Sequence, residues 1–107
     1  MKDTDKDKEE ILPKFHLVPS SQFKKDLKKY KNIPDKRKAI TDTVKILKNF
    51  GHEKIPQEMN LHELKGEWRG YWECHIEPDL LLIWNEDEKE SIIKLARVGS
   101  HANLFKM

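Results

Sequence analysis

The sequence has a single cysteine, Cys74, among its 107 residues, so no disulfide can form within the chain. No apolar run approaches the roughly 20 residues that a membrane-spanning helix needs. No stretch has the pattern of a secretory signal peptide, and repeats and low-complexity tracts are also missing. A chain with these absences is expected in the reducing cytoplasm, away from membranes.

The charge is unevenly distributed along the chain, although the net charge is only +2. Residues 23–50 carry ten basic and three acidic side chains, a net of +7, whereas residues 51–107 carry a net of −4. A positive block of this kind suits a polyanion or an acidic protein partner. A solvated, lysine-rich helix face is the alternative explanation, and charge alone does not decide between the two.

Hydrophobic periodicity predicts a single α+β domain over residues 13–107, preceded by a mobile extension at residues 1–12. The predicted order is β-α-α-β-β-β, a small antiparallel sheet with both N-terminal helices packed on one face. The expected strands are residues 14–19, 68–77, 80–84 and 91–98; the expected helices are 22–31 and 35–50; residues 52–66 and 85–90 are expected to be loops.

The stretch from Trp68 to Glu77 alternates apolar and polar side chains, which predicts a strand with one face under the helices and one face open. Trp68, Trp72 and Cys74 belong to the covered face. The open face carries Arg69, Tyr71, Glu73 and His75. The following Glu-Pro-Asp sequence predicts a tight turn. Residues 80–84 are apolar without alternation, which is typical of a central strand covered on both faces.

Ionisable side chains are expected to meet at one end of this sheet. The turn keeps His75 close to Asp79, and the next hairpin places Asp79 opposite the end of the last strand. The chain then continues directly to His101, so these three residues are predicted to converge. Around them we expect His62 from the preceding loop, Arg97 at the end of the last strand, and Phe105 folded back over the edge.

Such a set of residues is suited to cleaving RNA without a metal or another cofactor. The reaction needs a base for the 2′-hydroxyl, an acid for the departing 5′-oxygen, and a cation for the charge on phosphorus. Histidine suits both proton transfers, Asp79 can orient a histidine or act as the base, and Arg97 can hold the phosphate. Predicted contacts to RNA involve stacking by Tyr71, Trp72 and Phe105, and phosphate binding by Arg69, Lys24, Lys25, Lys28 and Lys29.

Each residue also has a structural explanation, and only their convergence favours a site. Arg97, for example, can simply pair with Glu73 or Glu77. Three histidines and an aspartate can also bind zinc, but their spacing matches no compact metal motif. A metal-dependent hydrolase and a non-catalytic RNA- or ribosome-binding module therefore stay open as alternatives.

Several motifs in register resemble the RelE superfamily of toxins from bacterial toxin–antitoxin systems, in its YafQ-like branch. The pattern is His-x-Leu-x-Gly, Gly-aromatic, His-x-x-Pro-Asp, Arg-x-Gly-x-His and a terminal Leu-Phe, and the likeness covers residues 14–107. The matching residues are His62, Leu64 and Gly66; Gly70 and Tyr71; His75, Pro78 and Asp79; Arg97, Gly99 and His101; Leu104 and Phe105.

The resemblance implies a microbial RNase fold and an mRNA endoribonuclease that cuts translating messages in the ribosomal A site. It also implies a cognate antitoxin that blocks the toxin. The residues it ties to activity are His62, His75, Asp79, His101 and Phe105, with His101 as the strongest candidate for direct proton transfer. Relatives often carry arginine where this chain has Trp72, which the alternation above turns toward the helices.

Overall fold

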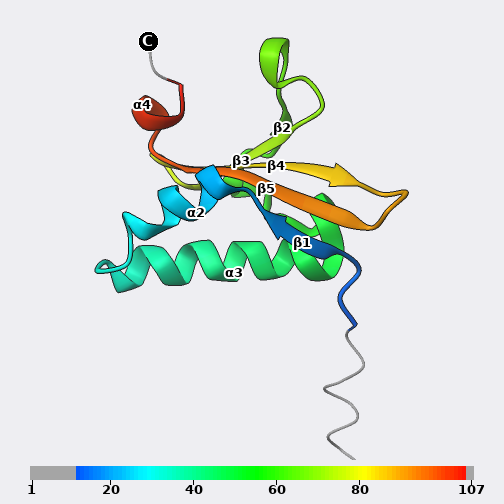
Figure 1. Ribbon diagram of the computed structural model, residues 1–107, viewed down its shortest axis with the longest axis horizontal. Coiled ribbons are helices and arrows are strands. Elements are labelled where there is room, and N and C mark those ends of the chain that lie inside the picture. The colour runs from blue at the N-terminus through cyan, green and yellow to red at the C-terminus, as the bar shows by residue number, and fades with distance from the viewer. Residues whose placement is uncertain (1–11, 106–107) are drawn as a thin grey trace, which may run out of the picture.

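The computed structural model describes residues 12–105 as a five-stranded sheet, in the order β1-β5-β4-β3-β2, with helices on both faces. Helix α3 crosses one face, whereas α4 and the segment around β2 stand on the other (Figure 1). The strands are β1 (His16–Pro19), β2 (His62–Glu63), β3 (Trp72–Glu77), β4 (Leu80–Asp87) and β5 (Ile92–Gly99). The helices are α2 (Ser21–Lys28), α3 (Pro34–Phe50) and α4 (His101–Leu104), with 3₁₀ turns η1 (Gly51–Lys54), η2 (Gln57–Met59) and η3 (Gly66–Trp68).

The predicted α+β class and its two N-terminal helices are confirmed, but the sheet is not wholly antiparallel. Strand β1 runs parallel to β5, with His16 opposite Ile92. The two strands are far apart in sequence, so no hairpin imposes an antiparallel pairing on them. The predicted extension at residues 1–12 lies outside the described residues, apart from Leu12.

The predicted loop over residues 52–66 contains a short strand. Within it, β2 pairs with β3, placing His62 opposite Glu73. The two-residue length of this pairing left no periodic signal in the sequence.

The predicted strand over residues 68–77 is wrong in its first part, because β3 begins only at Trp72. Gly70, with φ of 95°, bends the chain, and its carbonyl accepts a hydrogen bond from the Asn85 side chain at 2.9 Å. Trp68 consequently packs edge-to-face on Tyr71, with ring centroids 5.2 Å apart, on the sheet face opposite to α3. Trp68 therefore lies in a turn before β3, and not in the alternating strand where it was predicted.

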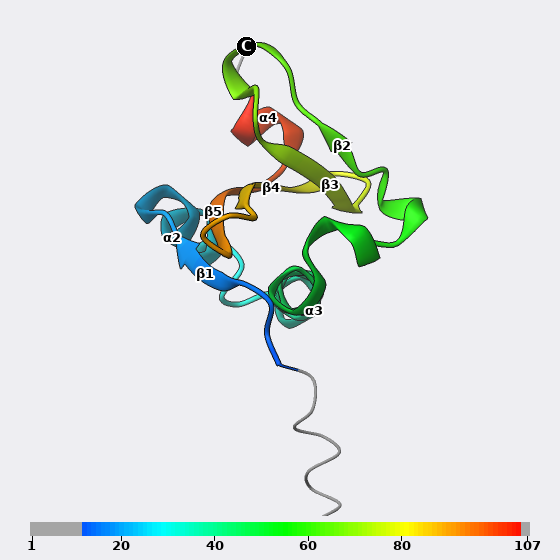
Figure 2. The ribbon, with the colours of Figure 1, turned by 90° about the vertical axis from the view of Figure 1, so that its right-hand side faces the viewer.

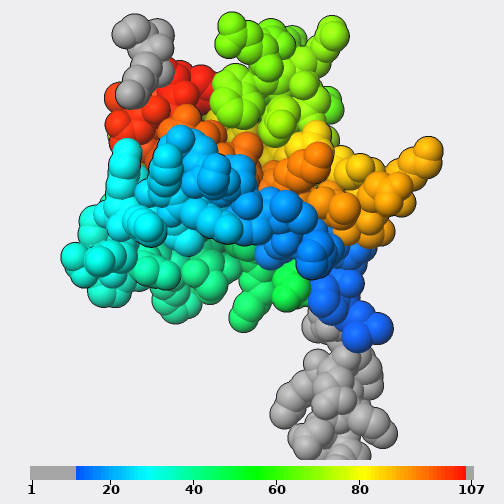
Figure 3. Space-filling model, viewed as in Figure 1, coloured from blue at the N-terminus to red at the C-terminus, as the bar shows by residue number. Residues whose placement is uncertain are grey.

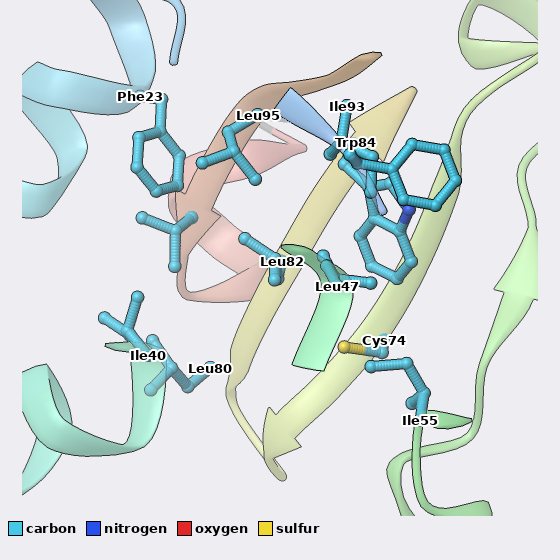
Figure 4. Packing of buried hydrophobic residues seen from close by; sticks show 12 residues of the cluster. Phe23, Ile40, Leu47, Ile55, Cys74, Leu80, Leu82, Trp84, Ile93 and Leu95 are labelled. Atoms are coloured by element: carbon cyan, nitrogen blue, oxygen red, sulfur yellow. The ribbon is translucent and has the colours of Figure 1, made fainter. Parts of the chain in front are cut away.

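Strand β4 lies at the centre of the sheet and is covered on both faces, as predicted. Its residues Leu80 to Trp84 are all buried. Leu82 and Trp84 pack toward Leu47 of α3 in the main core (Figure 4). Leu81 and Ile83 pack with Leu104 of α4 on the other face. The polar face of the sheet is thus partly closed rather than open.

Local chemistry sets the helix ends. The Ser20 hydroxyl accepts the N–H of Phe23 at 2.9 Å and caps α2. Pro34 occupies the first turn of α3, where its missing N–H costs nothing. Gly51 ends α3 with φ of 72°. Among residues 12–105, no helix has both the length and the apolarity needed to cross a membrane.

Gly51 is a position where alanine is expected to cost much stability. Its φ of 72° and ψ of −158° are open almost solely to glycine, and an added Cβ would lie 2.7 Å from Glu86 Oε2 and 2.8 Å from Phe15 Cε2. We expect Gly51→Ala to lower the free energy of unfolding by about 2–4 kcal/mol, measured by urea denaturation. Gly66→Ala is the control, because Gly66 also has positive φ but open space around it; a loss of about 1 kcal/mol is expected there. Equal losses at the two sites would contradict the steric argument.

Trp72 faces the helices, as the alternation predicted. Its ring stacks on His52 with centroids 4.2 Å apart and planes 14° from parallel. His52 is held in turn by the buried carboxylate of Glu86, through Nδ1 at 2.8 Å and through its main-chain N–H. Glu86 also accepts the indole N–H of Trp84 at 3.1 Å. Trp72 therefore has a packing role here.

Candidate active site

Two projections on the sheet face opposite to α3 enclose a hollow of about 430 Å³. One is α4, and the other is the β2–η3 segment; both rise above the sheet (Figures 2 and 3). The floor is formed by β3 and β4. The five predicted activity residues all line it: His62, His75, Asp79, His101 and Phe105. The predicted convergence of His75, Asp79 and His101 is therefore confirmed.

His101 is presented by α4, a helix that the sequence analysis did not predict. The Ser100 hydroxyl caps this helix by accepting the N–H of Asn103 at 3.2 Å, and Asp79 Oδ1 accepts the His101 N–H at 2.9 Å. Asp79 thus holds the main chain of His101 rather than its ring. The exposed imidazole packs edge-to-face against Phe105, with centroids 5.1 Å apart. Within residues 12–105 the ring forms no hydrogen bond, so neither ring nitrogen is engaged by another described residue.

The second group of ionisable residues surrounds Glu73, which the sequence analysis did not select as a site residue. Glu73 is only 5% exposed. Its Oε1 lies 3.1 Å from His62 Nε2 and 3.6 Å from His75 Nε2. The imidazole of His62 is also held at Nδ1, 2.9 Å from the carbonyl oxygen of Asn60. The carboxylate therefore lies between the two histidines that β2 and β3 contribute.

The sequence contained a signal for Glu73. It precedes His75 by two residues on β3, so both side chains must emerge on the same face of the sheet. The pattern did not reveal the burial of Glu73, because the two-residue strand β2, which pairs with β3 and places His62 opposite Glu73, carries no periodic signal of its own.

Arg97 lies outside the hollow, so its expected position beside His75 and Asp79 is wrong. Its Nε and one terminal nitrogen donate to Asp26 of α2, at 2.8 and 3.1 Å, and it does not pair with Glu73 or Glu77. Helix α2 continues along β5 where β1 ends, which brings Asp26 to the guanidinium. Arg97 lines a separate recess with Gln22, Lys29, Asn103 and Leu104.

Asp26 is buried, and its carboxylate accepts hydrogen bonds from the Arg97 guanidinium, from the Val98 N–H at 3.1 Å and from the Gln22 side chain. Burial by itself raises the pKa of this carboxyl, but these donors outweigh it, so the pKa of Asp26 is lowered from its ordinary value. The same contact raises the pKa of Arg97. The ion pair therefore stays charged at neutral pH.

The remaining predicted RNA-binding residues do not line the hollow. Tyr71 is half-buried against Trp68, and Arg69 is exposed in the turn before β3. Lys24, Lys25 and Lys28 are exposed on α2, and Lys29, the residue that follows this helix, is exposed as well. Within residues 12–105 none of these lysines forms an ion pair.

The described part of the chain was predicted to carry three histidines and an aspartate close together, a set that can also bind zinc. No group of three or more His, Cys, Asp or Glu side chains there is arranged to hold a metal ion.

Solved structures of bacterial toxins share this fold. The crystal structure of YafQ from Escherichia coli strain BL21(DE3) has a TM-score of 0.75 and 27% sequence identity, covering 85% of this chain and 98% of that one. The structure of the E. coli DinJ-YafQ toxin-antitoxin complex has a TM-score of 0.74 and 28% identity, covering 86% and 98%. The fold and the hollow thus define the class: a small α+β bacterial toxin with its ionisable groups at one rim of the sheet.

Sequence comparison identifies the family. The mRNA interferase toxin YafQ of E. coli strain K12 is 33% identical over an alignment of 89 residues that covers 80% of this chain and 90% of that protein. Residues 15–106 match the family model described as bacterial toxin of type II toxin-antitoxin system, YafQ. The chain belongs to this YafQ family, and the resemblance predicted from its motifs is confirmed.

Proposed function

We propose that this protein is the toxin of a type II module and an endoribonuclease that cleaves mRNA on the ribosome, in the A site. The observation that carries the proposal is the hollow in which His62, His75, Asp79, His101 and Phe105 meet. Membership of a family whose E. coli member is named an mRNA interferase supports the substrate. Because the proposed substrate is mRNA on translating ribosomes, we place the action of the protein in the cytoplasm.

The cleavage requires two proton transfers and no redox step. A base removes the 2′-hydroxyl proton, the 2′-oxygen attacks phosphorus, and the bond from phosphorus to the 5′-oxygen breaks as an acid protonates that oxygen. The products are a 2′,3′-cyclic phosphate and a 5′-hydroxyl. We assign the transfer to the 5′-oxygen to His101, whose exposed ring is free of other partners among the described residues. Asp79 holds this histidine through its main chain, and Phe105 supplies an aromatic face for a base.

The basic surface would hold ribosomal RNA through phosphate contacts. The four lysines at positions 24, 25, 28 and 29, in and directly after α2, are exposed together with Arg69, and their charges are available. Arg97 and Lys29 line the same recess, and these two cations suit a phosphate near the site rather than the scissile one. Trp68 packs against the ring of Tyr71, so an RNA base must pass Trp68 to stack on Tyr71.

The partner of the toxin would be a cognate antitoxin that blocks it. A structure of the E. coli relative is titled as a DinJ-YafQ toxin-antitoxin complex. A small neighbouring gene whose product suppresses toxicity of this chain would supply the partner here.

The proposal is tested by adding the purified protein to a translating extract and mapping RNA ends. We expect new ends inside the reading frame, only when the message is being translated. Ribosome binding without new ends would overturn the enzyme assignment and favour a binding module. Loss of cleavage on removal of zinc, restored by zinc, would instead favour a metal-dependent hydrolase.

A further inference from the structure

Glu73 is a buried carboxylate whose neighbours in the hollow are imidazoles. No lysine or arginine among residues 12–105 forms an ion pair with it, and its close partners are His62 Nε2 at 3.1 Å and His75 Nε2 at 3.6 Å. A carboxylate removed from water is costly unless a cation balances it. A proton on one of these histidines is therefore needed to stabilise the native site.

The surroundings of His62 indicate where that proton is. Its Nδ1 faces the Asn60 carbonyl oxygen at 2.9 Å, and a carbonyl only accepts hydrogen bonds, so Nδ1 carries a proton. Its Nε2 lies 3.1 Å from Glu73 Oε1, within the distance of an ion pair. A second proton on Nε2 makes His62 the cation that balances the buried Glu73 carboxylate, and imidazole is a stronger base than a carboxylate. His62 is then an imidazolium.

We infer that Glu73 is a positioning residue that keeps His62 protonated and leaves His75 as the neutral base for the 2′-hydroxyl. The 3.6 Å separation of His75 Nε2 from Glu73 is longer than a hydrogen bond, so His75 is not committed to this contact before the reaction. When His75 accepts the proton, the same carboxylate stabilises the new charge. Asp79 and His101 are the other ionisable groups that line the hollow. The inference rests on the proposed nuclease function for its kinetic part.

The kinetic test compares Glu73→Gln with Glu73→Asp. Glutamine has the same shape, and its amide can donate to a neutral His62 Nε2, so the fold keeps its contact while the charge is lost. We expect Glu73→Gln to lower the cleavage rate on saturating ribosome complexes by about 100-fold, with the half-saturating concentration nearly unchanged. Glu73→Asp, which keeps the charge, is expected to be about tenfold faster than the glutamine variant.

Glu63→Gln is the matched control, since Glu63 lies beside His62 on β2 but is exposed and does not line the hollow. It is expected to cleave like the unaltered protein. Wild-type cleavage by Glu73→Gln, or equal loss in the glutamine and aspartate variants, would overturn the inference, because the second result indicates packing rather than charge.

A spectroscopic test is independent of cleavage. In ¹⁵N-histidine-labelled protein at neutral pH, His62 is expected to show protons on both ring nitrogens, and only on Nδ1 in Glu73→Gln. A singly protonated His62 in the unaltered protein would overturn the inference even if the protein cleaves messages. Conversely, a doubly protonated His62 in a protein that cleaves nothing would support the arrangement at Glu73 while the proposed function fails.

Discussion

His101→Ala is expected to slow message cleavage by about 10²- to 10⁴-fold, the usual contribution of a positioned acid or base. The fold should survive, because the contacts that place α4 use main-chain groups. Asp79 accepts the His101 N–H and Ser100 caps the helix, and alanine retains both interactions. We expect the free energy of unfolding to change by less than about 0.5 kcal/mol. The measurements are the cleavage rate, growth arrest on expression, and urea denaturation.

His16→Ala is the matched control for this experiment. His16 is an exposed histidine on β1 and does not line the hollow. It is expected to retain full cleavage and toxicity. If His101→Ala stays fully toxic and cleaves as fast as the His16 variant, the role assigned to His101 is wrong.

Asp26→Asn is expected to be the most destabilising of the charge-removing substitutions. Asp26 is 2% exposed and accepts two hydrogen bonds from Arg97 and one from the Val98 N–H. Asparagine keeps the shape but leaves Arg97, which is 21% exposed at its side chain, without a counter-charge. Because breaking a buried pair on one side costs about 3–5 kcal/mol and Arg97 is partly hydrated, we expect a loss of about 2–3 kcal/mol in urea denaturation at neutral pH.

Asp42→Asn provides the exposed counterpart. Asp42 pairs with Lys38 at 2.8 Å on α3, but both side chains are more than half exposed. Water screens this pair, so a loss of no more than about 0.5 kcal/mol is expected. Similar losses for Asp26→Asn and Asp42→Asn would show that burial does not strengthen the Asp26–Arg97 pair.

The Asp26–Arg97 pair predicts that the stability of the protein depends on pH. The native pKa of Asp26 is lowered below its ordinary value of 3.8, so in acid the unfolded chain binds a proton before the native protein does. The stabilisation is therefore complete above that ordinary value and is lost as the pH falls through the native pKa. We expect the stability difference between the unaltered protein and Asp26→Asn to shrink over this acid range. A difference that stays constant down to the lowest pH would contradict the lowered pKa.

The main elements of the fold were predictable because their signals are local. The stripe of Ile40, Val44 and Leu47 defined α3, and Gly51 marked its end. The continuous apolar run from Leu80 marked the central strand. Strand β2 and helix α4 were not predicted, because a two-residue strand and a four-residue helix carry no period of their own. Strand β2 forms because it pairs with β3, and α4 forms because Leu104 packs on Leu81 and Ile83 of β4.

Most residues of the site could be predicted from the sequence, but the contacts between them could not. The turn after His75 and the hairpin between β4 and β5 brought Asp79 and His101 together, as antiparallel strands must. Arg97 was misplaced because its partner, Asp26, is 71 positions away in sequence. Glu73 was missed because its burial depends on the segment that covers it.

By itself, the sequence determined the order of the longer helices and strands, the family, and the end of the sheet at which the histidines gather. These properties follow from periodicity, turn residues and short-range connections, which act between neighbours along the chain. Only the tertiary structure decided which charges are buried and paired: Asp26 with Arg97, and Glu73 between His62 and His75. Burial and pairing depend on what covers a residue in space, and the covering segments come from distant parts of the chain.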